Sequence, residues 1–245
     1  MNSKETKNRQ NLSYARGLIN SSKFIYLFLP GFLGTPEDFT PLLSHLRCPA
    51  KVVPLSLEIE EVLLNEPLGT ILVGYSMGGR IALQMQARYP QHFPSLILLS
   101  SHLGLKTQEE RRLQKMREEN WLQAMRTLSL DAFISQWYAQ PLFSSLKDKP
   151  SLFTALVQHR TACNLPLHAA LFEKFRLSNQ EEIFPLPNTW LFYGTKDLKY
   201  ADLYSNLAYT KRSVSDAGHA VHLENPASCA RYIEEYDADL RRKTS

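Results

Sequence analysis

A serine flanked by glycines is the first group in the chain whose type and position suit catalysis. Ser76 lies in the stretch Gly74–Gly78, after the apolar run Thr70–Val73 and before a helical pattern with an apolar residue every fourth position. Strand, sharp turn and helix in that order hold a serine hydroxyl exposed in a strained turn. A hydroxyl is a poor nucleophile or base until a partner takes its proton. The chain must therefore supply a histidine and an acid.

His219 and Asp197 are the partners that fit this requirement best. His219 follows the last short strand, and Asp197 directly follows the strand Thr189–Tyr193. Because parallel strands end at one edge of a sheet, a carboxylate after one strand can face a histidine after the next. The competing acids are weaker candidates, since Asp202 lies further past the strand and Asp216 is close to His219 along the chain.

The other histidines are less well placed. His102 follows the strand after Ser76 and can line the site, whereas His222, about one helical turn from His219, is expected at the surface. The remaining four lie in or beside helices or in the central helical region: His45, His92, His159 and His168.

Two backbone N–H groups are candidates for binding negative charge beside Ser76. Met77 begins the helix, and the first N–H groups of a helix have no partner within it. The second candidate is Phe32, in the loop Pro30–Gly34 after the first apolar run, where Gly31 lets the backbone turn inward. Two such donors form an oxyanion hole, which stabilises an oxygen as negative charge develops on it.

The elements that must position these residues alternate along the first hundred residues. Apolar runs of strand length at 24–29, 51–53, 70–73 and 96–100 are separated by helical patterns. The first of these patterns has Thr35 as its cap and Pro36 and Asp38 as its first and third residues, and it is expected to run to about His45. This alternation predicts an α/β fold with a mostly parallel, doubly wound sheet that carries helices on both faces.

The pattern changes after the fourth strand. From 107 to about 179 only helical segments are expected, and strands return at 189–193 and 212–214 before a last helix from 226 to about 240. The helical block therefore interrupts one sheet and forms a cap on it. The expected organisation is a polar N-terminal extension (1–22), a core (23–103 and 185–245) and an inserted helical cap (about 104–184).

The composition of the chain limits the kinds of molecule that it is expected to bind. Of the 245 residues, 44% are hydrophobic and 21% are charged, and the net charge of +4 is spread over scattered lysines and arginines. These values are ordinary for a globular protein, and they indicate no nucleic-acid surface. No apolar run is long enough for insertion into a membrane. The mild positive charge suits a small anionic substrate, and no feature of the sequence indicates an oligomeric state.

The cysteines allow a prediction about the cellular compartment and about metal binding. Cys48, Cys163 and Cys229 are far apart, and no cysteine–histidine spacing typical of a metal site is present. They predict reduced thiols and a cytoplasmic location, and no metal or other cofactor is expected.

Several motifs together resemble one family. The order Ser76, Asp197, His219 is that of the α/β-hydrolase fold. Residues 29–34 (LPGFLG), 74–80 (GYSMGGR) and 104–111 (GLKTQEER) resemble the 2-succinyl-6-hydroxy-2,4-cyclohexadiene-1-carboxylate (SHCHC) synthases, the MenH family. The W-Y-x-Q-P-x-F signature of that family is matched within 133–143, and the segments 217–219 (AGH) and 224–226 (ENP) also fit. The likeness covers nearly everything from Phe24 to the last helix, although Pro30 stands where many relatives have histidine.

This resemblance implies a lyase of menaquinone biosynthesis rather than a hydrolase. Its substrate would be 2-succinyl-5-enolpyruvyl-6-hydroxy-3-cyclohexene-1-carboxylate, from which a base removes a ring proton and pyruvate leaves. Ser76, activated by His219 and oriented by Asp197, would then be a general base rather than an acylating nucleophile.

A substrate with several carboxylates requires arginines. Arg80 lies one helical turn after Ser76 on the inward face, and Arg160 falls where the family has a substrate arginine. The charged helix contributes either Arg112 or Arg117. The candidate substrate-binding residues are Tyr75, Arg80, Arg112, Arg117, Trp137 and Arg160.

Other activities use the same residues. A carboxylesterase, such as one that cleaves the methyl ester of pimeloyl-carrier protein, would use Ser76 as a true nucleophile, and a thioesterase or C–C hydrolase would need the same triad. A non-catalytic binding module of the same fold is the alternative from a different class, although such modules usually lack one member of the triad.

Overall fold

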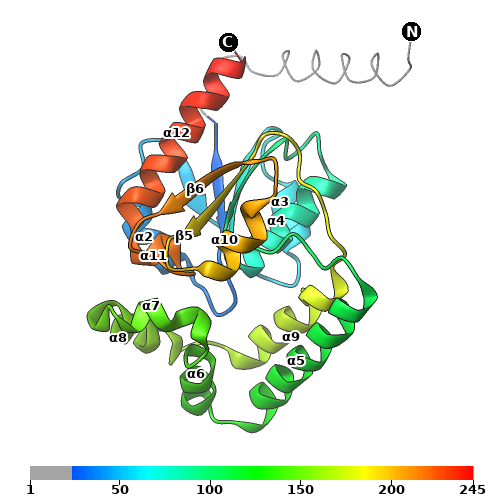
Figure 1. Cartoon of the computed structure of the whole chain (residues 1–245), viewed down its shortest axis with the longest axis vertical. Helices are drawn as coiled ribbons and strands as arrows, with labels where there is room; N and C mark the ends of the chain where they lie inside the picture. The colour runs from blue at the N-terminus through cyan, green and yellow to red at the C-terminus, as the bar shows by residue number, and fades with distance from the viewer. Residues whose placement is uncertain (1–23, 245) are drawn as a thin grey trace.

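A parallel sheet forms the centre of the molecule. Figure 1 shows the computed structural model, which describes residues 24–244, so the extension expected at 1–22 lies outside the described residues. The strands are arranged in the order β2-β1-β3-β4-β5-β6, and every neighbouring pair is parallel. Their bounds are β1 (Tyr26–Leu29), β2 (Ala50–Val52), β3 (Ile71–Tyr75), β4 (Ser95–Leu99), β5 (Thr189–Gly194) and β6 (Thr210–Val214).

Helices cover both faces of this sheet, as its uniformly apolar strands require. Along β1, Tyr26 and Phe28 pack with η1, α2, α11 and α12 on one face, while Leu27 and Leu29 pack with α3, α4 and α10 on the other. The helices of the core are η1 (Pro36–Phe39), α2 (Thr40–Leu43), α3 (Ile59–Leu64), α4 (Met77–Arg88), α10 (Leu198–Ser205), α11 (Val221–Glu224) and α12 (Pro226–Thr244).

The remaining helices lie between β4 and β5 in the chain and gather on one side of the core, coloured green to yellow in Figure 1. Their apolar residues, which include Leu122, Phe133, Leu156 and Phe172, form one cluster with Leu33 and Ala220 of the core. We call this segment the cap. Its elements are α5 (Gln108–Thr127), α6 (Leu130–Tyr138), η2 (Pro141–Phe143), α7 (Ser144–Lys147), α8 (Pro150–Arg160), α9 (Leu165–Lys174) and η3 (Leu177–Asn179).

The two ends of the cap meet in a short stem. Leu105 and Glu181 form an isolated parallel bridge, and the Ile183 N–H donates to the Leu103 carbonyl at 2.8 Å. Gly104, between the two leucines, has φ +112°, and a Cβ there would lie 2.0 Å from the Glu181 carbonyl oxygen. Only glycine fits so close an approach, so the stem depends on this position.

Two parts of the fold differ from expectation. The helix predicted from Pro36 to about His45 is split into η1 and α2, since Pro41 has no N–H with which to continue η1, and α2 ends at Leu43. Helix α10 was not expected, but the parallel pair β5 and β6 needs a crossover, and α10 provides it. No helix within residues 24–244 is long and apolar enough to cross a membrane.

Candidate active site

The turn between β3 and α4 holds Ser76 in a strained conformation. Its φ is +50°, a region that residues other than glycine rarely occupy. Gly78 lets the start of α4 pass against the loop after β1, because a Cβ there would lie 2.3 Å from the carbonyl oxygens of both Leu29 and Pro30. Strain at one residue, supported by tight packing around it, is typical of a nucleophile elbow.

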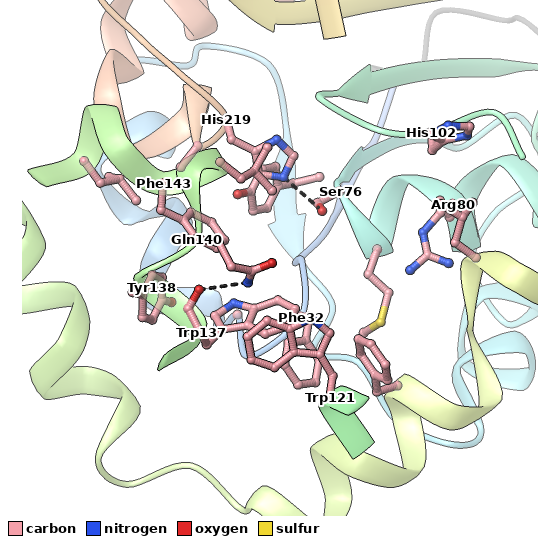
Figure 2. Close-up of a pocket in the computed structure, with 18 of the residues that line it drawn as sticks. Phe32, Ser76, Arg80, His102, Trp121, Trp137, Tyr138, Gln140, Phe143 and His219 are labelled. Carbon is pink, nitrogen blue, oxygen red and sulfur yellow. Dashed lines mark hydrogen bonds between the residues drawn. The ribbon is translucent and has the colours of Figure 1, made fainter. Parts of the chain in front are cut away.

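Three loops bring Ser76, His219 and Asp197 together. The Ser76 Oγ lies 3.2 Å from the His219 Nε2, a contact drawn in Figure 2, and the His219 Nδ1 lies 3.1 Å from the Asp197 Oδ2. The other carboxylate oxygen of Asp197 accepts from the Tyr200 N–H at 3.2 Å. Since the carboxylate accepts, Nδ1 carries the proton of the neutral ring and Nε2 is free to accept from the serine hydroxyl.

Burial keeps the histidine in its neutral form. His219 is 2% exposed, and this burial lowers the pKa of its imidazole below the ordinary value, while the hydrogen bond and charge of Asp197 act in the opposite direction. The competing acids lie elsewhere. Asp216 is exposed and pairs with Lys149 and Lys196. A neutral imidazole beside a serine hydroxyl is the arrangement that a general base requires.

The loop after β1 runs beside the serine. A Cβ at Gly31 would lie 3.4 Å from the Ser76 Cβ and 2.8 Å from the Tyr75 ring, so the backbone approaches closely there. In the described part of the chain, the N–H groups of Phe32 and Met77 have no protein acceptor. Two unpaired donors near one hydroxyl are what an oxyanion hole needs.

A cavity of about 290 Å³ opens onto Ser76, with walls from the core and the cap. Aromatic rings form one wall: the Trp137 ring centroid lies 4.7 Å from that of Phe32 and 4.8 Å from that of Trp121 (Figure 2). Such a wall keeps water from the serine and leaves polar groups to set the orientation of a ligand. The sequence-predicted residues that line the cavity are Phe32, Tyr75, Ser76, Met77, Arg80, His102, Arg117, Trp137, Arg160 and His219.

Arg112 is not part of this cavity. It is exposed on α5 and forms an ion pair with Glu109 at 2.8 Å. Arg117 follows five positions later, about 140° around the helix axis, and lines the cavity instead. The candidate Arg112 is therefore wrong, because α5 turns that side chain to the solvent.

Arg80 points toward the cavity from α4 (Figure 2). Its Nη1 donates to the Phe175 carbonyl, and no carboxylate among residues 24–244 forms an ion pair with it. Burial lowers the pKa of this guanidinium, but an arginine remains charged at neutral pH. A charge without a carboxylate partner, next to a cavity, suits an anionic ligand.

Arg160 is held by the core. Its Nη2 lies 2.5 Å from the Asp38 Oδ2, its Nε donates to the Tyr138 hydroxyl at 3.2 Å, and its Nη1 has no partner in the part of the chain that is described. Asp38 was expected only as the third residue of a helix. Its carboxylate accepts from the Thr35 N–H at 3.0 Å and also pairs with the cap.

The sequence reasoning missed or misplaced several lining residues, among them Lys199 and His222. Lys199 lines the cavity from α10, the helix that was not predicted. His222 was expected at the surface, but it is 1% exposed and stacks on Phe39 with ring centroids 4.4 Å apart. Burial lowers the pKa of His222 to about 3, so it is neutral. The rings of His219 and His222 both pack against Tyr75, with centroids 5.3 and 4.3 Å away, but His219 lies before α11, so no helical spacing in the sequence indicates this.

Comparison with known proteins agrees with this geometry. A family model described as "Alpha/beta hydrolase family" matches residues 27–232. The chain therefore belongs to the alpha/beta hydrolase family.

Within that family its relatives are the SHCHC synthases. The SHCHC synthase of Shigella sonnei is 34% identical over 215 residues, which are 83% of this chain and 79% of that protein. The Escherichia coli O1:K1 enzyme of the same name is 34% identical over 161 residues, 64% of this chain and 63% of that protein. The chloroplastic protein PHYLLO of Arabidopsis thaliana is 28% identical over 84% of this chain, which spans 15% of that larger protein. The resemblance stated from the motifs is confirmed.

Solved structures show the same fold. MenH from S. aureus has a TM-score of 0.76 at 18% identity and covers 92% of this chain and 97% of its own. A thermophilic esterase from Thermogutta terrifontis has a TM-score of 0.68 at 15% identity and covers 91% of this chain and 92% of its own. The expected α/β-hydrolase fold is thus confirmed.

Proposed function

We propose that this protein is an SHCHC synthase, a lyase that converts 2-succinyl-5-enolpyruvyl-6-hydroxy-3-cyclohexene-1-carboxylate to 2-succinyl-6-hydroxy-2,4-cyclohexadiene-1-carboxylate and pyruvate. The observation that carries the proposal is a serine–histidine–aspartate constellation that opens into a capped, cation-lined cavity. The names of the relatives supply the reaction.

The chemistry is a 1,4-elimination. The ring proton at C2 is adjacent to the succinyl carbonyl, so removing it gives an enolate. The electron pair then forms C2=C3, the former C3=C4 bond moves to C4=C5, and the C5–O bond breaks. The electron pair of that bond leaves with the oxygen, and the departing enolate of pyruvate takes up a proton at its methylene carbon and becomes pyruvate. The step needs one base and one site for the oxygen of the enolate.

Both requirements have candidates in the site. The Ser76 oxygen takes the C2 proton while the His219 Nε2 accepts the proton of the hydroxyl, and Asp197 stabilises the resulting imidazolium. The N–H groups of Phe32 and Met77 bind the enolate oxygen as its charge develops. No covalent bond to the serine is required.

The charges around the cavity suit a small substrate with three carboxylates. Four cationic side chains line it against two carboxylates, an excess of two positive charges with the histidines neutral. Arg80 forms an ion pair with none of the carboxylates between residues 24 and 244, and it is the first candidate for a substrate carboxylate. The cations are Arg80, Arg117, Arg160 and Lys199, and the acids are Asp38 and Glu118.

Ester or thioester hydrolysis is the second candidate. In that reaction the ester or thioester would acylate Ser76, which the same histidine and aspartate would activate. A solved esterase shares the fold. The positive lining favours the lyase, because a neutral ester gains nothing from it. We also propose a cytoplasmic location, supported by free thiols at Cys48, Cys163 and Cys229.

A spectroscopic assay separates the two. Purified protein is given the enolpyruvyl substrate, and diene absorbance and released pyruvate are followed together. The proposal expects equal amounts of both from the wild type and neither from Ser76→Ala. Rapid hydrolysis of simple esters without diene formation would exclude the lyase and leave the esterase.

A further inference from the structure

We propose that the Glu224 carboxylate is a positioning group for His219, and that Lys149 connects the same loop to the cap. This inference rests on the proposed role of His219 as the proton acceptor of Ser76. It assigns functions to two residues that do not line the cavity.

Glu224 holds the backbone on both sides of the histidine. Its Oε2 accepts from the Gly218 N–H at 2.8 Å, and its Oε1 accepts from the Ala220 N–H at 3.0 Å. The residue is 6% exposed, and within residues 24–244 no cationic side chain forms an ion pair with it. A buried carboxylate needs strong donors, and these two N–H groups provide them.

The geometry of the triad depends on that loop. His219 lies between the two residues whose N–H groups Glu224 binds, so its backbone is fixed from both sides. Its contacts with Ser76 and Asp197 are 3.2 and 3.1 Å, near the long end of useful hydrogen bonds. A shift of the loop by about 1 Å would break one of them, at a cost of about 100-fold in rate.

Lys149 ties both ends of this segment to the cap. It directly precedes α8, and its Nζ donates to the carbonyl of Asp216 at 2.8 Å and to that of Glu224 at 2.7 Å. The same ammonium pairs with the Asp216 carboxylate at 3.0 Å. One cap residue therefore binds the chain before and after His219.

A second contact shows how closely the cap approaches. A Cβ at Gly218 would lie 2.0 Å from the Ser145 Oγ in α7, so only glycine lets the cap rest on this loop. If the cap moves away, both Lys149 and Ser145 leave the loop. Of the contacts described here, only those of Glu224 would then still hold the backbone around His219.

Glu224 also acts on the histidine through its charge. Its negative charge raises the pKa of His219, as does that of Asp197, while burial and the positive charge of Lys199 lower it. Removing the Glu224 charge should therefore lower the pKa of His219 further. The other titratable side chains that face this imidazole are Tyr75, Tyr200 and His222.

The first test compares Glu224→Gln with the wild type. The amide keeps the shape but turns an NH2 group toward one of the two N–H groups, so one hydrogen bond is lost. We expect kcat to fall about 10- to 100-fold with KM nearly unchanged. The acidic limb of the kcat/KM profile should move to lower pH, which a merely structural role would not cause. A folded variant with wild-type kcat and an unmoved limb would overturn the role of Glu224.

The second test addresses the cap and does not depend on the first variant folding. Lys149→Met should lower kcat about 3- to 10-fold, whereas Lys147→Met, at an exposed lysine of α7, should not. Equal kcat values for the two variants would overturn the link to the cap.

NMR titration of His219 separates this inference from the proposed function. A lower pKa of His219 in Glu224→Gln supports the positioning role whether or not the wild type forms the diene. An unchanged pKa refutes that role, whereas a wild type without diene formation refutes the proposed function alone.

Discussion

The buried pair between Asp38 and Arg160 allows a quantitative prediction about stability. The pair joins η1 of the core to α8 of the cap, with 2.5 Å between the Asp38 Oδ2 and the Arg160 Nη2, and the side chains are 5% and 3% exposed. Asp38→Asn keeps the shape of the side chain and removes its charge. The guanidinium then remains buried without a counter-charge, which is the costly way to break such a pair.

The magnitude follows from that burial. Removing one partner of a buried pair typically costs about 3–5 kcal/mol, and the retained amide oxygen places this change at about 3 kcal/mol. For a chain of this size, 1 kcal/mol shifts Tm by roughly 2–4 °C, so Tm should fall by about 6–12 °C. Replacing the arginine as well removes the stranded charge, so Asp38→Asn/Arg160→Met should regain about 1–2 kcal/mol over the single variant.

Urea denaturation followed by circular dichroism, together with calorimetry, measures both quantities. Asp202→Asn, at an exposed carboxylate on α10, is the matched control and should change the free energy of unfolding by less than about 0.5 kcal/mol. A loss below about 1 kcal/mol for Asp38→Asn would refute the reasoning. A double variant less stable than Asp38→Asn would also refute the reasoning, since the unpaired charge of Arg160 could then not be the cause of the loss.

Three further predictions concern catalysis. Ser76→Ala should lower kcat for diene formation by about 10⁴-fold in a folded protein, and near-normal turnover would exclude Ser76 as the base. Arg80→Ala should cost about 2–4 kcal/mol in kcat/KM for the tricarboxylate but leave p-nitrophenyl acetate hydrolysis unchanged, and equal losses would make Arg80 a structural residue. Since burial lowers the pKa of His219 and only the neutral ring accepts a proton, the acidic limb of kcat/KM should lie below 6.5, and a limb above that value would contradict it.

The catalytic candidates could be located from the sequence because topology alone places them. Ser76, Asp197 and His219 each follow a strand of one parallel sheet, and the carboxyl ends of such strands share an edge. The short apolar runs and the glycines around the serine carry that information locally. The loop proposed to form the oxyanion hole could be located from the sequence in the same way, because it follows the neighbouring strand β1.

The site residues in the cap were harder to predict from the sequence, because their positions depend on how the cap helices pack on the core. The sequence alone does not distinguish Arg112 from Arg117 as the substrate-binding arginine of α5. The packing of α5 decides between them, because it turns Arg117 and not Arg112 to the cavity. Lys199 was missed together with α10, whose mixture of tyrosines and polar residues carries no clear apolar period. The pairing of Asp38 with Arg160 joins residues 122 positions apart, and no local pattern reports it.

The stem formed by Leu105 and Glu181 has a consequence for how such an enzyme can change over time. Because the two chain ends of the cap are neighbours, the whole insertion leaves and re-enters the core at almost one point. A cap of another length or shape can be exchanged there without altering the register of any strand. Selection can then alter the substrate through cap side chains such as Trp137 and Arg117, while the serine, histidine and aspartate on the core stay as they are.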